Sequence, residues 1–193
     1  MHTWMWGEMY PDFMDALMPL ASAPVQIAGR NRLLRDMIIE SIRSDPEYKG
    51  GEYDHPIHGL KAAQYVERIM TSSPLQMQKQ YPTRDAADDY FKELTDAAMK
   101  LDANDMLYQF AASYDYNPEP DLSKIKARLT AVNSADDEVN PPELGILERT
   151  INQVKNGRFV LMPTGPETRG HGTHSVAAAW KQYLVELLQA DAR

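Results

Sequence analysis

The sequence contains no cysteine, and this absence excludes several classes of protein at once. A disulfide framework, a thiolate nucleophile and a cysteine-ligated zinc site all require a residue that the chain does not have. The absence also fits a reducing compartment, so the cytoplasm is our default expectation for a localisation that the sequence leaves unknown.

Long apolar segments are missing as well. No window approaches the ~20 apolar residues that a membrane-spanning helix needs. The first residues, MHTWMWGEMYPDF, have neither the basic start nor the long apolar core of a signal peptide. We therefore expect no membrane partner.

Positive charge is scarce. The 193 residues include 20 Lys and Arg against 28 Asp and Glu, which gives a net charge of −8. An acidic surface does not attract nucleic-acid phosphates or anionic lipids, so we expect no nucleic-acid partner. The length is sufficient for one domain with its own core.

A serine nucleophile in its usual setting is also absent. None of the serines lies in a Gly-x-Ser-x-Gly sequence, the sharp strand-to-helix turn that exposes a catalytic hydroxyl in many hydrolases. Any serine chemistry would therefore need a hydroxyl from outside this chain.

Three segments have the apolar character of strands: residues 16–20, 127–133 and 159–162. Pro19 suggests a strand end or a sheet edge, and 159–162 has the continuous apolar run of a strand buried on both faces. Helical periodicity between these segments indicates an α/β fold, with a short parallel sheet of about three strands flanked by helices.

Helical patterns dominate the middle of the chain. We expect helices over about 26–43, 60–70, 85–101 and 103–112, the second ending at Ser72-Ser73-Pro74 and the third capped by Thr83 or Asp85. Residues 55–120 carry no strand signal and are a candidate lid. The chain thus divides into 1–54 with a strand and helices, the lid 55–120, and an α/β part 121–193.

Asp137 is the first candidate for chemistry, because it follows the second strand in a loop. A carboxylate there can orient an imidazole and stabilise its protonated form. Asp136 is an adjacent rival, and both acids also suit a solvated turn before a helix. Asn140-Pro141-Pro142-Glu143 predicts that helix, with Asn140 as its N-cap.

His171 is the second candidate. It lies between Gly170 and Gly172 after the third strand, and beside a carboxylate it has the properties of a general base. His174 is the rival, with an exposed or capping role as the simpler interpretation. The two histidines lack a fixed third ligand, so we expect no metal site.

Several segments in a shared order resemble the α/β-hydrolase superfamily, and within it the homoserine O-acetyltransferase-like family. The similarity extends through nearly the whole chain. The segments are Trp6-Gly7-Glu8-Met9-Tyr10-Pro11 with residues 15–22, residues 39–53, Leu101-Asp102-Ala103-Asn104-Asp105, residues 134–142, and Gly170-His171.

The resemblance implies the C-terminal part of an α/β-hydrolase fold with a helical lid at 55–120. In the family the catalytic Asp lies four residues before a proline, which selects Asp137 relative to Pro141. The catalytic His follows a glycine, which selects His171. The implied activity is ester hydrolysis or acyl transfer through a Ser-His-Asp triad, without a cofactor, on a small-molecule ester or an acyl-CoA-type substrate.

Two departures from the family pattern change this expectation. The family's Gly-x-Ser-Met-Gly-Gly turn continues into something close to Met-His-Thr-Trp, and this sequence begins with Met1-His2-Thr3-Trp4. We therefore expect the chain to start just after the nucleophile elbow and to be inactive alone. Members that act on homoserine carry an acid directly after the His, where this chain has Gly172, so homoserine is disfavoured.

Two hypotheses follow. The chain supplies Asp137 and His171 to a serine on another segment, or it is a non-catalytic fragment or interaction module of the same fold. Because the strand next to residues 16–20 is missing, we also expect a homodimer or a partner segment that carries the N-terminal half.

Overall fold

A computed structural model describes residues 1–189 and divides the chain into two compact units. One unit consists of Met1–Gln26 together with the chain from Tyr116 onward, and the other is Ile27–Asp115. No helix among the described residues is long and apolar enough to cross a membrane.

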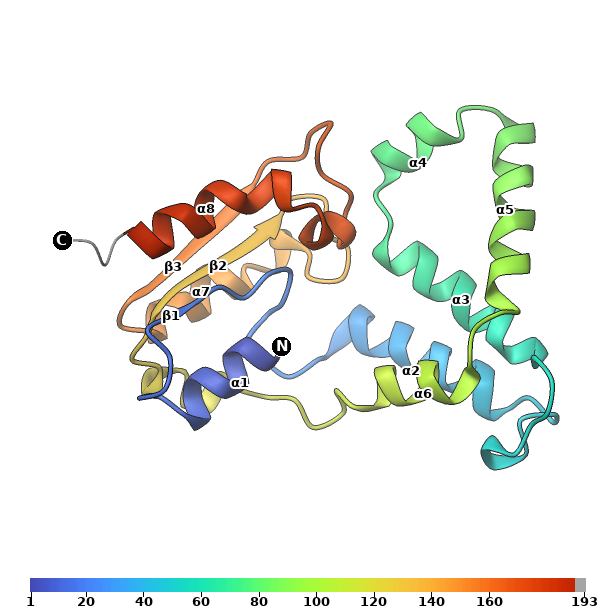
Figure 1. Ribbon diagram of the computed structural model, residues 1–193, viewed down its shortest axis with the longest axis horizontal. Coiled ribbons are helices and arrows are strands. Elements are labelled where there is room, and N and C mark those ends of the chain that lie inside the picture. The colour runs from blue at the N-terminus through green and yellow to red at the C-terminus, as the bar shows by residue number, and fades with distance from the viewer. Residues whose placement is uncertain (190–193) are drawn as a thin grey trace. The chain divides into compact units, whose positions relative to one another are not determined.

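The first unit holds the sheet and the helices around it (Figure 1). Its elements in chain order are α1 (His2–Met9), β1 (Ala16–Leu17), η2 (Glu119–Lys124), β2 (Arg128–Ser134), η3 (Pro142–Leu144), α7 (Ile146–Thr150), η4 (Ile151–Gln153), β3 (Gly157–Met162), η5 (Gly172–Ser175) and α8 (Ala177–Gln189).

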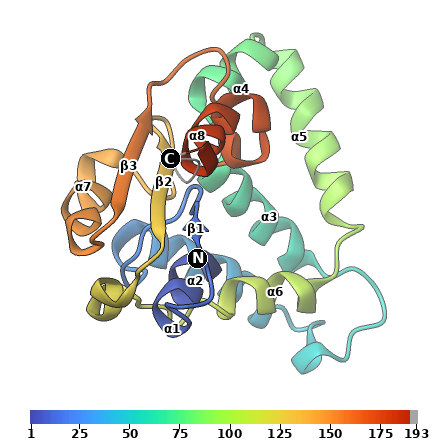
Figure 2. The same cartoon turned by 60° about the vertical axis from the view of Figure 1, so that its left-hand side comes forward.

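The three strands form a parallel sheet in the order β1-β2-β3. Beyond the short β1 ladder, Leu20 forms a further parallel bridge with Val132. Between Leu17 and Leu20, the Pro19 carbonyl accepts a hydrogen bond from the Val132 N–H (3.0 Å), a bond that does not need the N–H that proline lacks. Helices α7 and α8 lie on opposite sides of the sheet (Figure 2). The predicted α/β class with a short parallel sheet is confirmed.

The core of this unit lies on the α7 side of the sheet. Trp4 of α1 is fully buried there, and its indole N–H donates to the hydroxyl and carbonyl oxygens of Ser22 (3.1 and 3.2 Å). Burial of so large a ring with its polar atom satisfied is strongly stabilising. The core also includes Leu17, Leu122, Ile125, Ala127, Leu129, Ala131, Leu147, Ile151 and Val154.

The expectation that residues 159–162 are buried on both faces is wrong. Only Met162 is buried, and 39% of Leu161 is exposed. The sheet order places β3 at an edge of the sheet, with a neighbouring strand on one side among the described residues. The apolar run is therefore covered less completely than in a central strand such as β2, where six of seven residues are buried.

The predicted N-cap at Asn140 is also wrong. The chain after Asn140 forms the short 3₁₀ turn η3, and α7 begins only at Ile146, after Gly145 has adopted a left-handed conformation (φ 59°). The Asn140 side-chain amide instead donates to the Ala21 carbonyl (2.9 Å). A long-range bond thus replaces the local cap.

The second unit is entirely helical. It contains α2 (Gly29–Arg43), η1 (Lys49–Gly51), α3 (His58–Thr71), α4 (Pro74–Gln80), α5 (Arg84–Ala98) and α6 (Ala103–Ala111). Thr83 caps α5, because its hydroxyl accepts a hydrogen bond from the Ala86 N–H (3.2 Å). The compact unit includes α2 as well as the helices of residues 55–120, whose function as a lid stays a prediction.

One helix of this unit was missed. Ser72-Ser73-Pro74 ends α3, but Pro74 also starts α4, at the first helical position where its missing N–H is no loss. The same proline therefore separates two helices instead of beginning a loop.

Helices α2 and α3 pack closely because of Gly59. A Cβ atom added at Gly59 would lie 2.0 Å from the Ser41 carbonyl oxygen, so only glycine permits this approach. The Asp45 carboxylate closes the same junction, since it accepts bonds from the Gly59 N–H (2.6 Å) and the Glu47 N–H (2.9 Å). These backbone donors lower the pKa of Asp45 below its usual value.

Candidate active site

Asp137 lies in the turn that follows β2 and is almost completely buried, with 1% of the residue exposed. Its Oδ1 accepts hydrogen bonds from the backbone N–H groups of Val139 (2.8 Å) and Asn140 (3.2 Å). A carboxylate that folds back onto its own backbone in this way forms an Asx turn. The turn fixes the direction of the side chain.

His171 meets this carboxylate from the loop after β3. Its Nδ1 lies 3.1 Å from Oδ2 and 3.2 Å from Oδ1 of Asp137. Because a carboxylate only accepts, Nδ1 is the donor, and in the neutral ring Nε2 is then left with the lone pair. Among the described residues Nε2 has no hydrogen-bond partner. The arrangement is that of a general base with an acid behind it.

Asp136 is turned to the loop that carries His171. Its Oδ2 accepts hydrogen bonds from the Thr168 hydroxyl (3.0 Å) and from the Gly170 N–H (3.0 Å). Neighbouring aspartates therefore have separate partners: Asp137 contacts the imidazole, and Asp136 contacts the backbone next to it.

The Gly170 carbonyl is held as firmly as its N–H. The hydroxyls of Ser134 (3.1 Å) and Thr173 (2.7 Å) both donate to it. Gly170 itself has φ +61°, a left-handed conformation that favours glycine. The segment before His171 is thus fixed from β2 and from η5, which leaves the imidazole little freedom to move away from Asp137.

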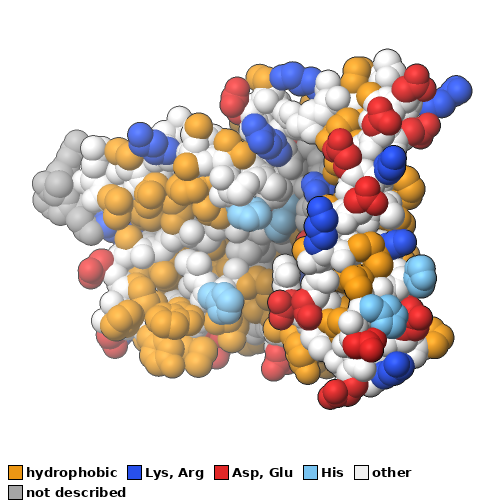
Figure 3. Space-filling view, turned by 45° about the vertical axis from the view of Figure 1, so that its right-hand side comes forward, with side chains coloured by type: hydrophobic (Ala, Val, Ile, Leu, Met, Phe, Trp, Pro, Cys, Tyr) orange, Lys and Arg blue, Asp and Glu red, His pale blue; other side chains and the backbone are white. Residues whose placement is uncertain are grey.

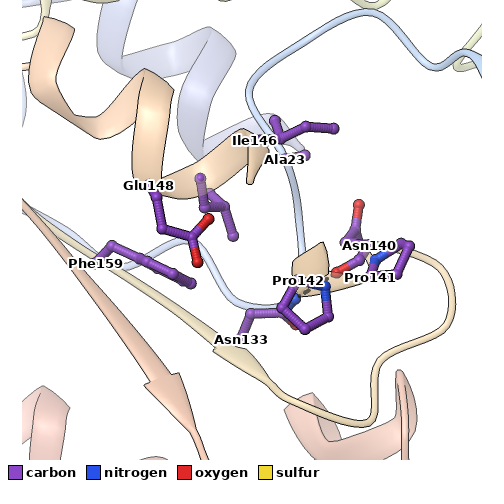
Figure 4. A pocket seen from close by; sticks show the side chains of 9 residues that line it. Ala23, Asn133, Asn140, Pro141, Pro142, Ile146, Glu148 and Phe159 are labelled. Carbon is purple, nitrogen blue, oxygen red and sulfur yellow. Dashed lines mark hydrogen bonds between the residues drawn. The ribbon is translucent and has the colours of Figure 1, made fainter. Parts of the chain in front are cut away.

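Asn140 supports the same turn. Its side-chain amide bonds to the Ala21 carbonyl and lies 3.4 Å from Asp137 Oδ2. The buried Asn133 side chain in turn donates to the Asn140 carbonyl (2.8 Å). Figure 4 shows Asn133 and Asn140 beside Pro141 and Pro142 at a small cavity of about 10 Å³. The turn after β2 is therefore tied to the chain after β1.

No described contact joins His174 or His55 to the Asp137 carboxylate. His174 is exposed, its Nδ1 donates to the His171 carbonyl (2.6 Å), and its ring lies edge-on to the His171 ring with centroids 5.2 Å apart. His55, in the helical unit, contacts Asp54 (2.6 Å) and Glu47 (3.5 Å), and these acids raise the pKa of its ring. Within residues 1–189 no group of three His, Asp or Glu is placed to hold a metal ion.

The structure thus brings together the two residues that the sequence selected, Asp137 and His171. It also identifies two supporting residues that the sequence did not: Asp136, through its bonds to the loop, and Asn140, through its bond to Ala21. The spacing Asp-x-x-Asn is a weak signal for the second. Nothing in the sequence pattern indicates the first, because its partners lie more than 30 residues away.

Comparisons with known proteins show which fold the chain has. No family model matches the chain. Over 162 residues the chain is 28% identical to homoserine O-acetyltransferase from Haemophilus influenzae. This match covers 71% of this chain and 44% of that relative. The chain therefore spans less than half the length of this curated relative.

Solved structures agree. Homoserine O-acetyltransferase from Bacillus anthracis has a TM-score of 0.79 at 20% identity, over 96% of this chain and 56% of the other. Esterase E22 has a TM-score of 0.78 at 17% identity, over 96% of this chain and 57% of the esterase. The fold is that of part of an α/β hydrolase, and the resemblance to the homoserine O-acetyltransferase-like family is confirmed for a partial chain.

Proposed function

We propose that this chain, an α/β-hydrolase relative of the homoserine O-acetyltransferases, contributes the acid and the base of a Ser-His-Asp triad to a serine on a segment outside this sequence. The observation that carries the proposal is the pair of 3.1 and 3.2 Å contacts between His171 Nδ1 and a carboxylate that is buried and already bonded to backbone donors.

In this mechanism His171 Nε2 takes the proton of the serine hydroxyl as the oxygen attacks the carbonyl carbon of an ester. The imidazolium that forms is stabilised by Asp137, which stays ionised. His171 then returns the proton to the leaving group, the alcohol of an ester or the thiol of an acyl-CoA-type donor, and the acyl group remains on the serine. Water or an acceptor hydroxyl releases the acyl group in a second step with the same proton transfers.

The substrate class we propose is a small-molecule ester or an acyl-CoA-type donor. Gly172 follows the histidine and has no side chain to pair with an ammonium group. An unpaired ammonium in a closed site is costly, so an acceptor without an amino-acid head is favoured over homoserine.

The test is complementation. The isolated chain should give no saturable turnover of an activated ester, because a His-Asp pair has no nucleophile to activate. Adding the N-terminal segment of a homoserine O-acetyltransferase, with its elbow serine, should produce turnover. Asp137→Asn in this chain should lower that turnover by about 10⁴-fold, since the amide favours the wrong tautomer. His171→Ala should abolish it.

His55→Ala is the control, because His55 is an exposed imidazole of the helical unit that contacts Asp54 and Glu47 and not the Asp137–His171 pair. It should leave the complemented turnover close to that of the unchanged chain. Turnover by the isolated chain would contradict the need for an outside serine. Complemented turnover that survives His171→Ala would contradict the assignment of the base.

An interaction module is the second candidate function, and one observation favours it. Four of the exposed large apolar side chains of the first unit lie close together in the sequence, in α1 and just after it: Trp6, Met9, Tyr10 and Phe13. Hydrophobic side chains gather on the surface of this unit in Figure 3. Such a surface suits a partner segment or a second copy. Binding of the N-terminal segment to this surface without any turnover would select the module over the enzyme.

A further inference from the structure

The helical unit contains a cavity of about 350 Å³ that neither Asp137 nor His171 lines. Helices α3, α4 and α5 surround it, and most of its lining is apolar or aromatic. A volume of this size lies in the range of small-molecule sites, which begins at roughly 300 Å³. All lining residues belong to residues 27–115, so the cavity is complete within one unit.

Aromatic pairs fix the walls. The rings of Tyr81 and Tyr90 stack with centroids 4.0 Å apart and planes 15° from parallel, which joins the end of α4 to α5. Tyr65 of α3 packs on Phe91 of α5 with centroids 4.9 Å apart. The Tyr65 hydroxyl also hydrogen-bonds to the Thr95 hydroxyl (2.8 Å). Contacts of this kind hold three helices at a set separation, so the cavity is formed before any ligand arrives.

One cation faces this aromatic lining. Arg68 lines the cavity, and its guanidinium carbon lies 5.8 Å from the centroid of the Tyr90 ring. Its Nε is buried and has no hydrogen-bond partner within residues 1–189. The neighbouring acid on the helix, Glu67, instead accepts from the Gln64 side chain (2.9 Å). A buried donor on a charged group without an acceptor is costly, and an anion would remove that cost.

Tyr90 adds a neutral hydroxyl to the same wall. Burial raises the pKa of Tyr90 above its usual value, so the phenol does not compete with a ligand for the guanidinium as a phenolate would. The lining then has one charged group, aromatic faces and apolar side chains from Met77 and Leu94.

We propose that this cavity binds an amphipathic carboxylate, with its apolar chain against the aromatic walls and its carboxylate on Arg68. Octanoate is a suitable probe. The site is independent of the proposed acyl chemistry, because it needs neither the Asp137–His171 pair nor an added serine.

The test titrates the whole chain with octanoate, and separately with octan-1-ol and with acetate, by calorimetry. Octanoate should bind more tightly than octanol, which has the chain without the charge, and than acetate, which has the charge without the chain. Arg68→Met should weaken octanoate by about tenfold or more, because it removes the charged group that pairs with the carboxylate. Octanol binding should not change with this variant.

Phe91→Ala should weaken both octanoate and octanol, since it removes part of the wall. Lys92→Met removes a neighbouring charge that does not line the cavity and should change neither. Arg68→Lys keeps the charge and should retain most of the affinity. This variant shows whether weaker binding by Arg68→Met comes from the lost charge or from a disturbed fold.

Each of three results would overturn the proposal. The first is that the unchanged chain fails to bind octanoate, and the second is that Arg68→Met binds it as tightly as the unchanged chain. The third is a dimer, seen by sedimentation and dissociated by Phe91→Ala, in which a second copy of the chain occupies the cavity.

Discussion

Asp136 and Asp137 are adjacent in the chain, but their carboxylates bond to different partners. Asp137 holds the imidazole of His171, and Asp136 holds the Gly170 N–H next to it. Because successive residues point in different directions in a turn, one short segment fixes both the ring and the loop that carries it. The position of His171 therefore depends on two side chains, of which one never touches it among the contacts described.

Replacement of Asp136 separates these roles. Asp136→Ala removes the acceptor for the Gly170 N–H, and hydrogen exchange of that amide should accelerate by about tenfold or more, since a hydrogen bond to a charged group contributes roughly 1.5–3 kcal/mol. Asp136→Asn keeps an acceptor oxygen and should retain most of the protection. Mass spectrometry or NMR of the isolated chain measures the rate.

The Ala86 amide, whose bond to Thr83 lies in the helical unit, is the internal reference for this experiment. Equal exchange of Gly170 in the unchanged chain and in Asp136→Ala would refute the role of Asp136. The measurement needs no catalytic activity, so it does not depend on the proposed function.

The residues of the candidate pair were predictable from the sequence, but the residues that support them were not. Asp137 and His171 follow apolar strands and stand at motif positions, so local signals identify them. The bond of Asp136 to Gly170 depends on the path of the intervening loop. The Asn140 side chain bonds to Ala21, more than 100 residues away, and the sequence around it instead suggested a helix cap.

At the scale of elements, periodicity predicted all three strands and most helices, because buried positions recur with the period of each structure. The errors occur where one residue serves two elements. Pro74 follows the end of α3 and starts α4, and Gly145 interrupts the helix that Pro141 and Pro142 suggested. β3 lies where it was predicted, but it is less buried than predicted. Burial depends on neighbouring elements, which the sequence of a single segment does not specify.

The junction of α2 and α3 gives a sharp prediction at this scale. Gly59→Ala would bring a Cβ to 2.0 Å from the Ser41 carbonyl, so the helices must separate or shift. We expect the free energy of unfolding of the helical unit to fall by about 3 kcal/mol, at the upper end of overpacking effects. Urea titration followed by circular dichroism measures it.

Ala62→Gly is the control on the exposed face of the same helix. It should cost only about 1 kcal/mol, the difference in helix propensity. A Gly59→Ala variant as stable as this control would show that the close approach of α2 and α3 is not needed.

At the scale of the whole molecule, the first unit has two surface features that favour association: an unpaired strand edge and a cluster of exposed aromatic side chains. β1 pairs with β2 on one side, and its other edge is unpaired among the described residues. Beside the exposed Trp6, Tyr10 and Phe13 form ring contacts with it at 5.7 and 6.5 Å. Open edges and clustered aromatic side chains both favour association with another chain.

We therefore expect the isolated chain to self-associate. A Trp6→Gln, Phe13→Ser double variant should shift sedimentation toward the monomer, because it removes two of the three rings of the cluster, including the most exposed one. Tyr108→Ser is the control, since Tyr108 is 69% exposed but lies in the helical unit. A monomeric unchanged chain over the accessible concentration range would contradict this expectation.

The contacts around His171 have a consequence for any later assembly. Every described bond that orients the imidazole comes from residues of the first unit, between Ser134 and Thr173. Most of the entropy of ordering the ring is therefore lost when this unit folds, and little of it remains to be lost when a hydroxyl-bearing segment docks. A complementing peptide would meet a rigid receptor, so its affinity should depend on its own flexibility and hardly at all on that of the histidine loop.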